Sequence, residues 1–252
     1  MVEPILKTEH LCKRFGALSV ADDVSIDLGP NEIHAMIGPN GAGKTSLIGL
    51  ICGLLAPDSG QVFFEGADIT AEKLTSRARL GIARTTQLTS LFPTATVLEN
   101  MILAHEAATG RSTQYFGRVS DAALDEALAM LHEIGLNDRA NTRATTLSHG
   151  EQRRLELAMA LVTKPIVLIL DEPMAGTSPD ETQSLTKLLL SLKRRYAILL
   201  IEHDMEAVFA LADRISVLVG GKIIASGLPE IVRTNADVQA AYLGREKEPE
   251  HA

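Results

Sequence analysis

The residues best suited to chemistry form one octapeptide that fits the pattern G-x-x-x-x-G-K-[ST], namely Gly38-Pro39-Asn40-Gly41-Ala42-Gly43-Lys44-Thr45. An apolar run over 33–37 reads as a buried strand before it, and 45–55 reads as a helix after it. Strand, glycine loop and helix form the context that this pattern requires. The octapeptide therefore predicts a site for the phosphates of a nucleoside triphosphate, in preference to a merely structural glycine-rich turn.

The residue types explain how such a loop would bind phosphate. A helix N-terminus offers unpaired N–H groups at the positive end of a dipole. Gly38, Gly41 and Gly43 let the backbone curl so that its N–H groups converge on the anion. Lys44 would add a positive charge for the β- and γ-phosphates, and the hydroxyl of Thr45 is placed to ligate Mg²⁺.

A second motif is an apolar strand, 166–170, that ends in Asp171 and Glu172. Ligands of open parallel sheets bind at the carboxyl ends of the strands. Asp171 is therefore predicted to hold Mg²⁺, directly or through water. Glu172 is predicted to lie near the γ-phosphate as a general base that orients water for in-line attack. The alternative is a pair of acidic residues that simply closes a strand.

A third motif occupies 147–151. Ser148 followed by Glu151 is a capping box for a helix over 149–163. A serine N-cap beside Gly150 is also a phosphate site, because the helix N-terminus supplies N–H groups. The two interpretations are compatible: the serine caps the helix when the site is empty and contacts a γ-phosphate when it is filled.

The rest of the chain predicts an α/β fold. Alternation of apolar and polar residues over 5–28, continued by 61–66, predicts a small antiparallel sheet. Residues 96–163 are mostly helical, with a polar loop at 110–120. An amphipathic stripe expected in the core consists of Leu124, Leu128, Leu131 and Ile134. After Pro165 strands and helices alternate, which predicts a parallel sheet covered on both faces.

Composition excludes several classes of protein. The chain has 252 residues, of which 46% are hydrophobic, as expected for one globular unit with a subdomain. Its 24 basic and 32 acidic residues give a net charge of −8, which argues against nucleic-acid binding and against adhesion to anionic lipid. We find no apolar run of about 18 residues. The start lacks the features of a secretory signal, and Cys12 and Cys52 show no metal spacing, so a cytosolic protein is expected.

In their order and spacing, the three motifs resemble those of ATP-binding cassette (ABC) transporter ATPases, over about residues 5–244. Residues 147–151 match the signature of that family, usually written LSGGQ. The resemblance implies a P-loop NTPase (RecA-like) core over about 5–87 and 164–244. It also implies an N-terminal antiparallel β subdomain, an inserted α-helical subdomain over about 88–163 and a charged tail at 245–252.

The resemblance adds further candidate site residues. It implies that Phe15 stacks on adenine, that Gln87 links Mg²⁺ to the transporter interface, and that His203 is the switch histidine. It implies ATP binding by the whole loop, including Ser46. It also implies two ATPase subunits, identical or paralogous, that enclose two ATP molecules head to tail. Each site then joins the loop, Mg²⁺-binding and hydrolytic residues of one chain to Ser148 and Gly150 of the other.

Two departures from the family pattern concern the signature and the loop after Glu172. His149 and Glu151 stand where glycine and glutamine are usual. A carboxylate facing a γ-phosphate would repel it, so Glu151 is expected to turn back and cap its own helix. Ser178 stands where many relatives carry aspartate, and it is expected to begin a helix as a capping box with Glu181.

Within the family, the strings at 91–100, 148–156 and 241–244 look like those of branched-chain and hydrophobic amino acid importers. Urea and amide importers carry similar strings and stay an alternative. The resemblance implies a peripheral subunit at the cytoplasmic face of the inner membrane, bound to integral membrane permease subunits. A periplasmic or extracellular solute-binding protein is an indirect partner.

Two other classes of protein are disfavoured. A soluble ABC-type ATPase of translation or DNA repair generally carries two cassettes or a long coiled-coil insert, and this chain shows neither. A small-molecule P-loop kinase would not need the motif at 147–151 or a histidine at the position of His203.

Overall fold

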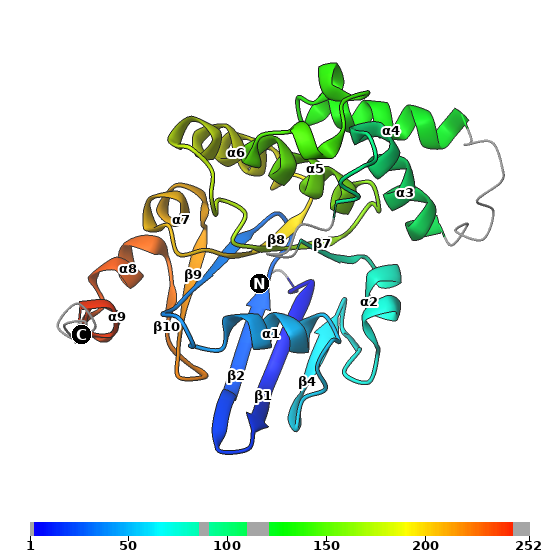
Figure 1. Ribbon diagram of the computed structural model, residues 1–252. Coiled ribbons are helices and arrows are strands. Elements are labelled where there is room, and N and C mark those ends of the chain that lie inside the picture. Colours follow the sequence, from blue (N-terminus) through cyan, green and yellow to red (C-terminus); the bar gives the residue numbers. More distant parts are fainter. Residues whose placement is uncertain (1–2, 86–90, 110–120, 244–252) are drawn as a thin grey trace.

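The computed structural model describes residues 3–85, 91–109 and 121–243 (Figure 1). In the first part of the chain, the elements are β1 (Leu6–Phe15), β2 (Leu18–Leu28), β3 (Ile33–Ile37), α1 (Lys44–Ile51), β4 (Ser59–Phe64), β5 (Ala67–Asp68), α2 (Leu74–Leu80) and β6 (Ile82–Arg84). The middle part holds α3 (Val97–Thr109), α4 (Asp121–Glu133), two short 3-10 helices (Asn137–Arg139 and Ala144–Thr146) and α5 (His149–Leu161). The last part holds β7 (Val167–Asp171), α6 (Pro179–Leu192), β8 (Ala197–Ile201), α7 (Met205–Leu211), β9 (Arg214–Val219), β10 (Lys222–Gly227), α8 (Pro229–Thr234) and α9 (Ala236–Leu243).

The strands form two sheets. The larger sheet has the order β10-β9-β3-β8-β7-β6, with parallel pairing from β9 to β6 and antiparallel pairing of β10 with β9. The smaller sheet is antiparallel and has the order β2-β1-β4-β5. Both predicted sheets are thus confirmed. Because β3, β7 and β8 run in parallel, their carboxyl ends meet at one edge of the larger sheet, where β3 leads into the glycine loop.

Both faces of the larger sheet are buried. Val167 and Ile169 of β7 belong to the apolar core that packs α1 between the two sheets. Leu168 and Leu170, the alternate residues, pack with α5, α6 and α7 on the opposite face. Successive side chains of a strand point to opposite faces, so a strand covered on both sides must be apolar throughout.

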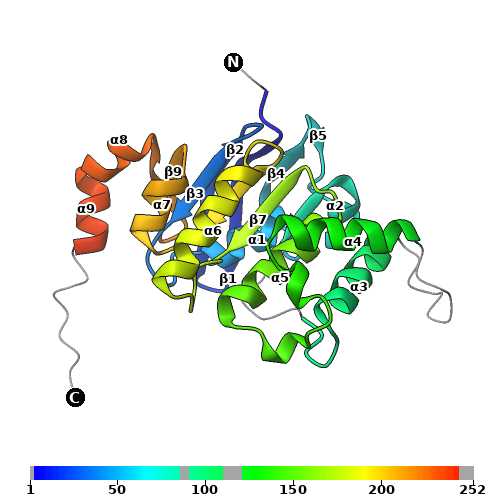
Figure 2. The same ribbon diagram turned by 90° about the horizontal axis from the view of Figure 1, so that it is seen from above.

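Helices α3, α4 and α5 lie together at one side of the larger sheet in both views (Figures 1 and 2). They share an apolar cluster that includes Leu131 and Ile134, as the stripe in the sequence predicts. Leu128 is 41% exposed, so its predicted place in the core is wrong. The buried face of α4 consists of Ala123, Ala127 and Leu131, and Leu128 lies outside it. Among the helices of the described residues, none combines the length and the apolar character that crossing a membrane requires.

Helix α1 ends earlier than predicted. It stops at Ile51, whereas the apolar pattern continues to residue 55. Gly53 terminates it with a φ of 75°, a left-handed conformation that favours glycine. A Cβ at Gly53 would lie 2.7 Å from the carbonyl oxygen of Glu72, so the chain also packs too closely there for a side chain.

Arg77 anchors the end of α1. Its side chain is fully buried, and its guanidinium donates to the carbonyl oxygens of Leu50 at 2.8 Å and Ile51 at 2.7 Å. It also donates to the carbonyl oxygen of Thr70 at 2.9 Å. The last carbonyls of a helix lack partners within the helix, and a cation there interacts favourably with the helix dipole. Arg77 of α2 therefore holds the helix that begins with Lys44.

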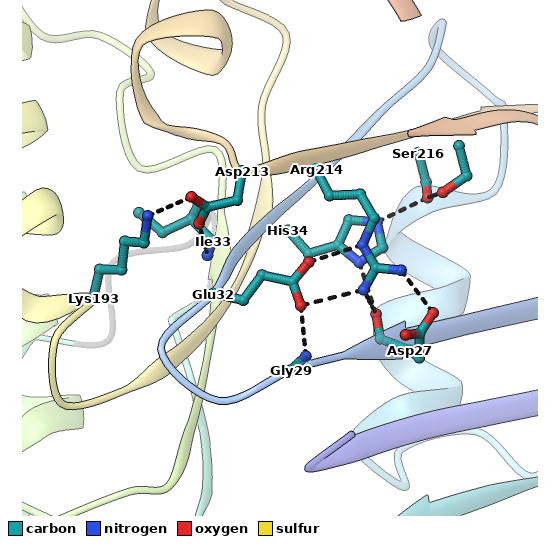
Figure 3. A network of polar contacts seen from close by, with 10 residues as sticks. Asp27, Gly29, Glu32, Ile33, His34, Lys193, Asp213, Arg214 and Ser216 are labelled. Carbon is teal, nitrogen blue, oxygen red and sulfur yellow. Dashed lines mark hydrogen bonds and ion pairs between the residues drawn. The ribbon is translucent and has the colours of Figure 1, made fainter. Parts of the chain in front are cut away.

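A polar network ties the smaller sheet to the larger one (Figure 3). Arg214 on β9 donates to the carboxylates of Glu32 and Asp27, at 2.8 and 2.7 Å. The two ring nitrogens of the buried His34 lie 2.9 Å from the carbonyl oxygen of Asp27 and 2.8 Å from the hydroxyl of Ser216. Burial lowers the pKa of His34 from its ordinary value, and the nearby charge of Arg214 adds to this effect.

The lowered pKa of His34 predicts a loss of stability on acidification. Below about pH 6.5 the unfolded chain takes up a proton that the folded state resists. This contribution to the free energy of unfolding is therefore complete above that pH. It falls as the pH drops, by at most about 1.4 kcal/mol per pH unit. His34→Gln should remove this component, so the stability difference between the variant and the wild type should shrink from pH 7.5 to pH 5.5.

Urea unfolding at both pH values measures the difference. The same substitution at the exposed His132 is the control for the loss of one imidazole. A stability gap between His34→Gln and the wild type that is equal at both pH values would contradict the assignment.

Candidate functional site

Two glycines of the loop between β3 and α1, Gly38 and Gly43, lie where no side chain fits. Gly41 and Gly43 adopt φ values of 78° and 107°. A Cβ at Gly43 would lie 2.2 Å from the carbonyl oxygen of Val20 on β2. A Cβ at Gly38 would lie 2.2 Å from that of Leu218 on β9. Both sheets thus fix the path of the loop. Gly38 and Gly43, the two glycines that the motif specifies, are also the two at which neighbouring backbone leaves no room for a side chain.

Lys44 begins α1, and its ammonium group lies inside the loop. It donates to the carbonyl oxygens of Gly38 at 2.6 Å and Pro39 at 3.1 Å. Burial lowers the pKa of Lys44, and the negative charges of Glu172 and Asp171 oppose that effect. The loop thus holds a cation opposite two carboxylates. Thr45, next along α1, is exposed.

Asp171 ends β7, as predicted, and its carboxyl group is buried. Its oxygen Oδ1 has no hydrogen-bond partner within the described residues. Burial raises the pKa of Asp171, and the charge of Glu172 raises it further. A buried acceptor without a partner costs about 1–3 kcal/mol, so a cation at this oxygen would be stabilising. The position has the chemistry of a hard-metal ligand.

Glu172 and His203 lie next to each other at the ends of adjacent strands. Glu172 follows β7 with a φ of 50°, which is uncommon for a residue other than glycine and is typical of functional sites. Its main-chain N–H donates to the carbonyl oxygen of Ile201, the last residue of β8. The Oε1 atom of Glu172 is 3.8 Å from Nδ1 of His203, whose side chain is 63% exposed. The structure therefore brings a carboxylate and an imidazole together at the edge where the loop lies.

Glu202 is a residue of this site that the sequence analysis did not identify. Its side chain is fully buried between the loops that follow β7 and β8. Its carboxylate accepts from the main-chain N–H groups of Met174 at 2.7 Å and His203 at 3.0 Å. Burial raises the pKa of Glu202, and these hydrogen bonds oppose that rise. Its position directly after a buried strand, in the sequence Glu-His-Asp, is the signal that could have indicated it.

The other predicted positions are placed as follows. Phe15, at the end of β1, is 49% exposed, and Nζ of Lys13 lies 5.6 Å from the centre of its ring. Gln87, predicted to contact Mg²⁺, lies outside the described residues.

Ser148 is the N-cap of α5, and its capping box is complete. Its hydroxyl accepts from the N–H of Glu151 at 3.2 Å, and the Glu151 carboxylate accepts from the N–H of Ser148 at 2.9 Å. Arg139 also donates to Glu151, at 2.9 Å. Glu151 thus turns back onto its own helix, as expected. A second carboxylate, from Glu181 on α6, accepts a 2.8 Å hydrogen bond from the Ser148 hydroxyl.

Comparison with known proteins agrees with this geometry. Residues 21–175 match the ABC transporter family, and residues 222–248 match the branched-chain amino acid ATP-binding cassette transporter family. The chain is 41% identical over 253 residues to the high-affinity branched-chain amino acid transport ATP-binding protein LivG of Escherichia coli strain K12. That alignment covers 97% of this chain and 99% of LivG. It is 38% identical to BraF of Pseudomonas aeruginosa, a protein with the same description, with the same coverage.

A solved structure is similar over the same length. The ADP conformation of MJ1267, an ATP-binding cassette of an ABC transporter, superposes with a TM-score of 0.88 at 32% identity. The match covers 96% of this chain and 100% of MJ1267. This likeness confirms the predicted P-loop fold with its antiparallel sheet and inserted helices. With its motifs, fold and full-length relatives in agreement, the chain belongs to the ATP-binding subunits of the ABC transporter family.

Proposed function

We propose that this chain hydrolyses ATP to drive the uptake of branched-chain amino acids through a membrane importer. The observation that carries the hydrolytic role is the shared edge of the larger sheet, where the loop after β3, which holds Lys44, and the end of β7, with Asp171 and Glu172, both lie. The amino acid substrate is supported by the full-length similarity to LivG and BraF and by the family match at 222–248. Urea or amide import is the alternative that these similarities disfavour.

Each residue of the site has a defined task in ATP hydrolysis. The N–H groups of loop 38–46 bind the phosphates, and Lys44 exchanges its two carbonyl acceptors for phosphate oxygens. The exposed ring of Phe15 stacks on adenine, a contact worth about 1–3 kcal/mol. Glu172 accepts a proton from the attacking water while the water oxygen bonds to the γ-phosphorus and the bond to ADP breaks. His203, beside Glu172, holds the γ-phosphate.

The residues present fit Mg²⁺ as the cofactor. Asp171 contributes a buried oxygen without a partner, and Thr45 contributes an exposed hydroxyl. Gln87 is the third candidate. Mg²⁺ needs only one or two protein carboxylates, because the phosphates of ATP supply further oxygens. When bound, Mg²⁺ would neutralise charge on the phosphates.

Two subunits would complete each site, as the resemblance implies. Ser148 is exposed at the N-terminus of α5, where the Ser148 hydroxyl and the N–H groups of the helix end can face a second chain. In the closed pair, Ser148 and Gly150 of one chain contact the γ-phosphate held by loop 38–46 of the other. ATP then favours the closed state because it contacts both halves only there. The two chains are identical or paralogous.

A cavity of about 610 Å³ supports attachment to a membrane subunit. We call it the α2–α3 groove, because α2 and α3 form two of its walls and β6 and α5 the others. Its lining combines small side chains, among them Ala78, Ala104, Ala107 and Ala108, with the charged side chains of Arg79, Arg84 and Glu156. A groove of this kind accommodates an amphipathic helix. We propose that it binds a cytoplasmic helix of the permease, which places the chain peripherally at the cytoplasmic face of the inner membrane.

This groove also offers a path for coupling. Arg84 and Thr85 line it at the end of β6. The N–H of Asp171 donates to the hydroxyl of Thr85 at 3.4 Å, which connects the groove to the end of β7. Movement at the nucleotide would thus be transmitted to the bound helix through β6 and β7.

Replacing Glu172 by glutamine tests the hydrolytic role. The amide cannot accept the proton of water, so ATPase activity should fall by about 100-fold or more. ATP should still bind and should hold two subunits together. Lys44→Ala is the matched comparison, because it should lose ATP binding itself, as measured by titration with a fluorescent nucleotide. Near-normal phosphate release by Glu172→Gln would exclude this residue as the general base.

Filling the α2–α3 groove tests the membrane attachment. Ala107→Trp should abolish co-purification with the permease subunits and uptake of labelled leucine, while the ATPase activity of the isolated subunit is kept. Ala122→Trp, at an exposed position of α4 outside the groove, is the control and should keep all three. Full retention of the permease by Ala107→Trp would place the docking surface elsewhere.

A further inference from the structure

Glu181 joins the N-termini of two helices. It lies in the first turn of α6, where its Oε2 accepts from the N–H of Ser178 at 2.9 Å and from the Ser178 hydroxyl at 3.1 Å. Its other oxygen, Oε1, accepts from the hydroxyl of Ser148 at 2.8 Å. The capping box of α6 accounts for the first oxygen. It does not account for the second, which binds the signature of a different helix.

Gly150 contributes to the same contact. A Cβ built on Gly150 would lie 2.5 Å from both Cδ and Oε1 of Glu181, so the carboxylate packs directly against this backbone. The main-chain N–H of Gly150 also stabilises the charged form of Glu181. The carboxylate therefore interacts with the hydroxyl of Ser148 and with the backbone at Gly150. These are the groups that the proposed function assigns to the γ-phosphate of a partner's ATP.

The charge at this position is fixed. Hydrogen bonds from the N–H of Ser178, and then from the hydroxyls of Ser148 and Ser178, lower the pKa of Glu181 to about 2. The N-terminus of α5 favours an anion, because the helix dipole is positive there. Glu181 thus supplies a second carboxylate at this helix end, beside that of Glu151, and it is the one that binds the Ser148 hydroxyl.

We infer that Glu181 is an internal counter-ion of the signature, which must leave Ser148 and Gly150 before they can bind the γ-phosphate of the partner's ATP. The inference rests on the proposed two-subunit site and names a residue that controls its closure. Glu181 occupies the Ser148 hydroxyl and the space at Gly150 that a γ-phosphate would need, so phosphate and carboxylate bind there in alternation. Glu181 is a positioning residue: it holds Ser148 and Gly150 ready in the separate subunit and sets the ATP concentration needed for pairing.

The direction in which the ATP concentration needed for pairing changes distinguishes this role of Glu181 from a purely structural one. A variant that loses only a helix cap should be less stable and should pair no better than its parent. A variant that loses a competing anion should pair at a lower ATP concentration, because the fraction of subunits with a free signature rises. Weakened capping and improved pairing in the same protein cannot both result from damage to the fold.

The test uses the Glu172→Gln chain, in which ATP is held without turnover. Sedimentation velocity measures the ATP concentration at which half of the subunits are paired. Adding Glu181→Gln should lower that concentration by about tenfold, equivalent to about 1.4 kcal/mol. Glu181→Ala, which removes the carboxyl group entirely, should lower it at least as much.

Two controls accompany the test. Asp180→Asn removes the same charge at the neighbouring, exposed position of α6. It should leave the half-maximal ATP concentration within about twofold, since the solvent screens an exposed charge that makes no hydrogen bond to the signature. Ser178→Ala removes the N-cap side chain of α6 but keeps the contact between Ser148 and Glu181. It should lower the melting temperature without improving pairing.

The possible outcomes distinguish a failure of the role of Glu181 from a failure of the two-subunit site. If the Glu172→Gln parent pairs with ATP but the Glu181 variants pair at the same or a higher ATP concentration, the inference is wrong and the two-subunit site stands. If the parent stays monomeric at saturating ATP, the two-subunit site fails, and the inference fails with it.

Discussion

The loop between β3 and α1 can present its N–H groups to a phosphate only where neither Gly38 nor Gly43 carries a side chain. Each of these glycines lies against a carbonyl oxygen of a different sheet, at Leu218 of β9 and Val20 of β2. The loop is therefore shaped by two sheets at once, which gives the small antiparallel sheet a role in nucleotide binding beyond its own stability. Arg77 secures the other end of α1 through its last carbonyls, so the helix that follows the loop is held at both ends.

The charges around the loop favour a bound polyphosphate and its cation. Burial raises the pKa of Asp171, whose free oxygen has no partner in the described residues, while Lys44 has to bond to carbonyl oxygens of its own loop. Glu202 differs, because backbone N–H groups from both neighbouring loops satisfy it. It holds the loops at Met174 and His203 in place rather than acting as a ligand. At the signature, the partner of the Ser148 hydroxyl comes from within the chain, since the carboxylate of Glu181 accepts its hydrogen bond.

Local rules predicted much of this arrangement from the sequence. The strands 33–37 and 197–201 and the capping boxes at Ser148 and Ser178 depend on nearby residues, and the structure agrees with all of them. The sequence could not reveal partners that tertiary packing brings together. Leu128 fits the apolar period of its helix and yet is exposed, because such a period does not show which flank of a helix meets its neighbours. Arg77, Glu202 and Glu181 bind groups that only the folded chain places within reach.

We propose that one γ-phosphate is bound by the glycine loop of one chain and by the serine-capped helix of another. In a crystal structure of the Glu172→Gln variant with ATP and Mg²⁺, the position of the Ser148 hydroxyl would decide this. We expect this hydroxyl within hydrogen-bond distance of a γ-phosphate held by the partner's loop, with Glu181 turned away. A nucleotide-bound structure in which Ser148 still donates to Glu181, or points into solvent, would contradict the account.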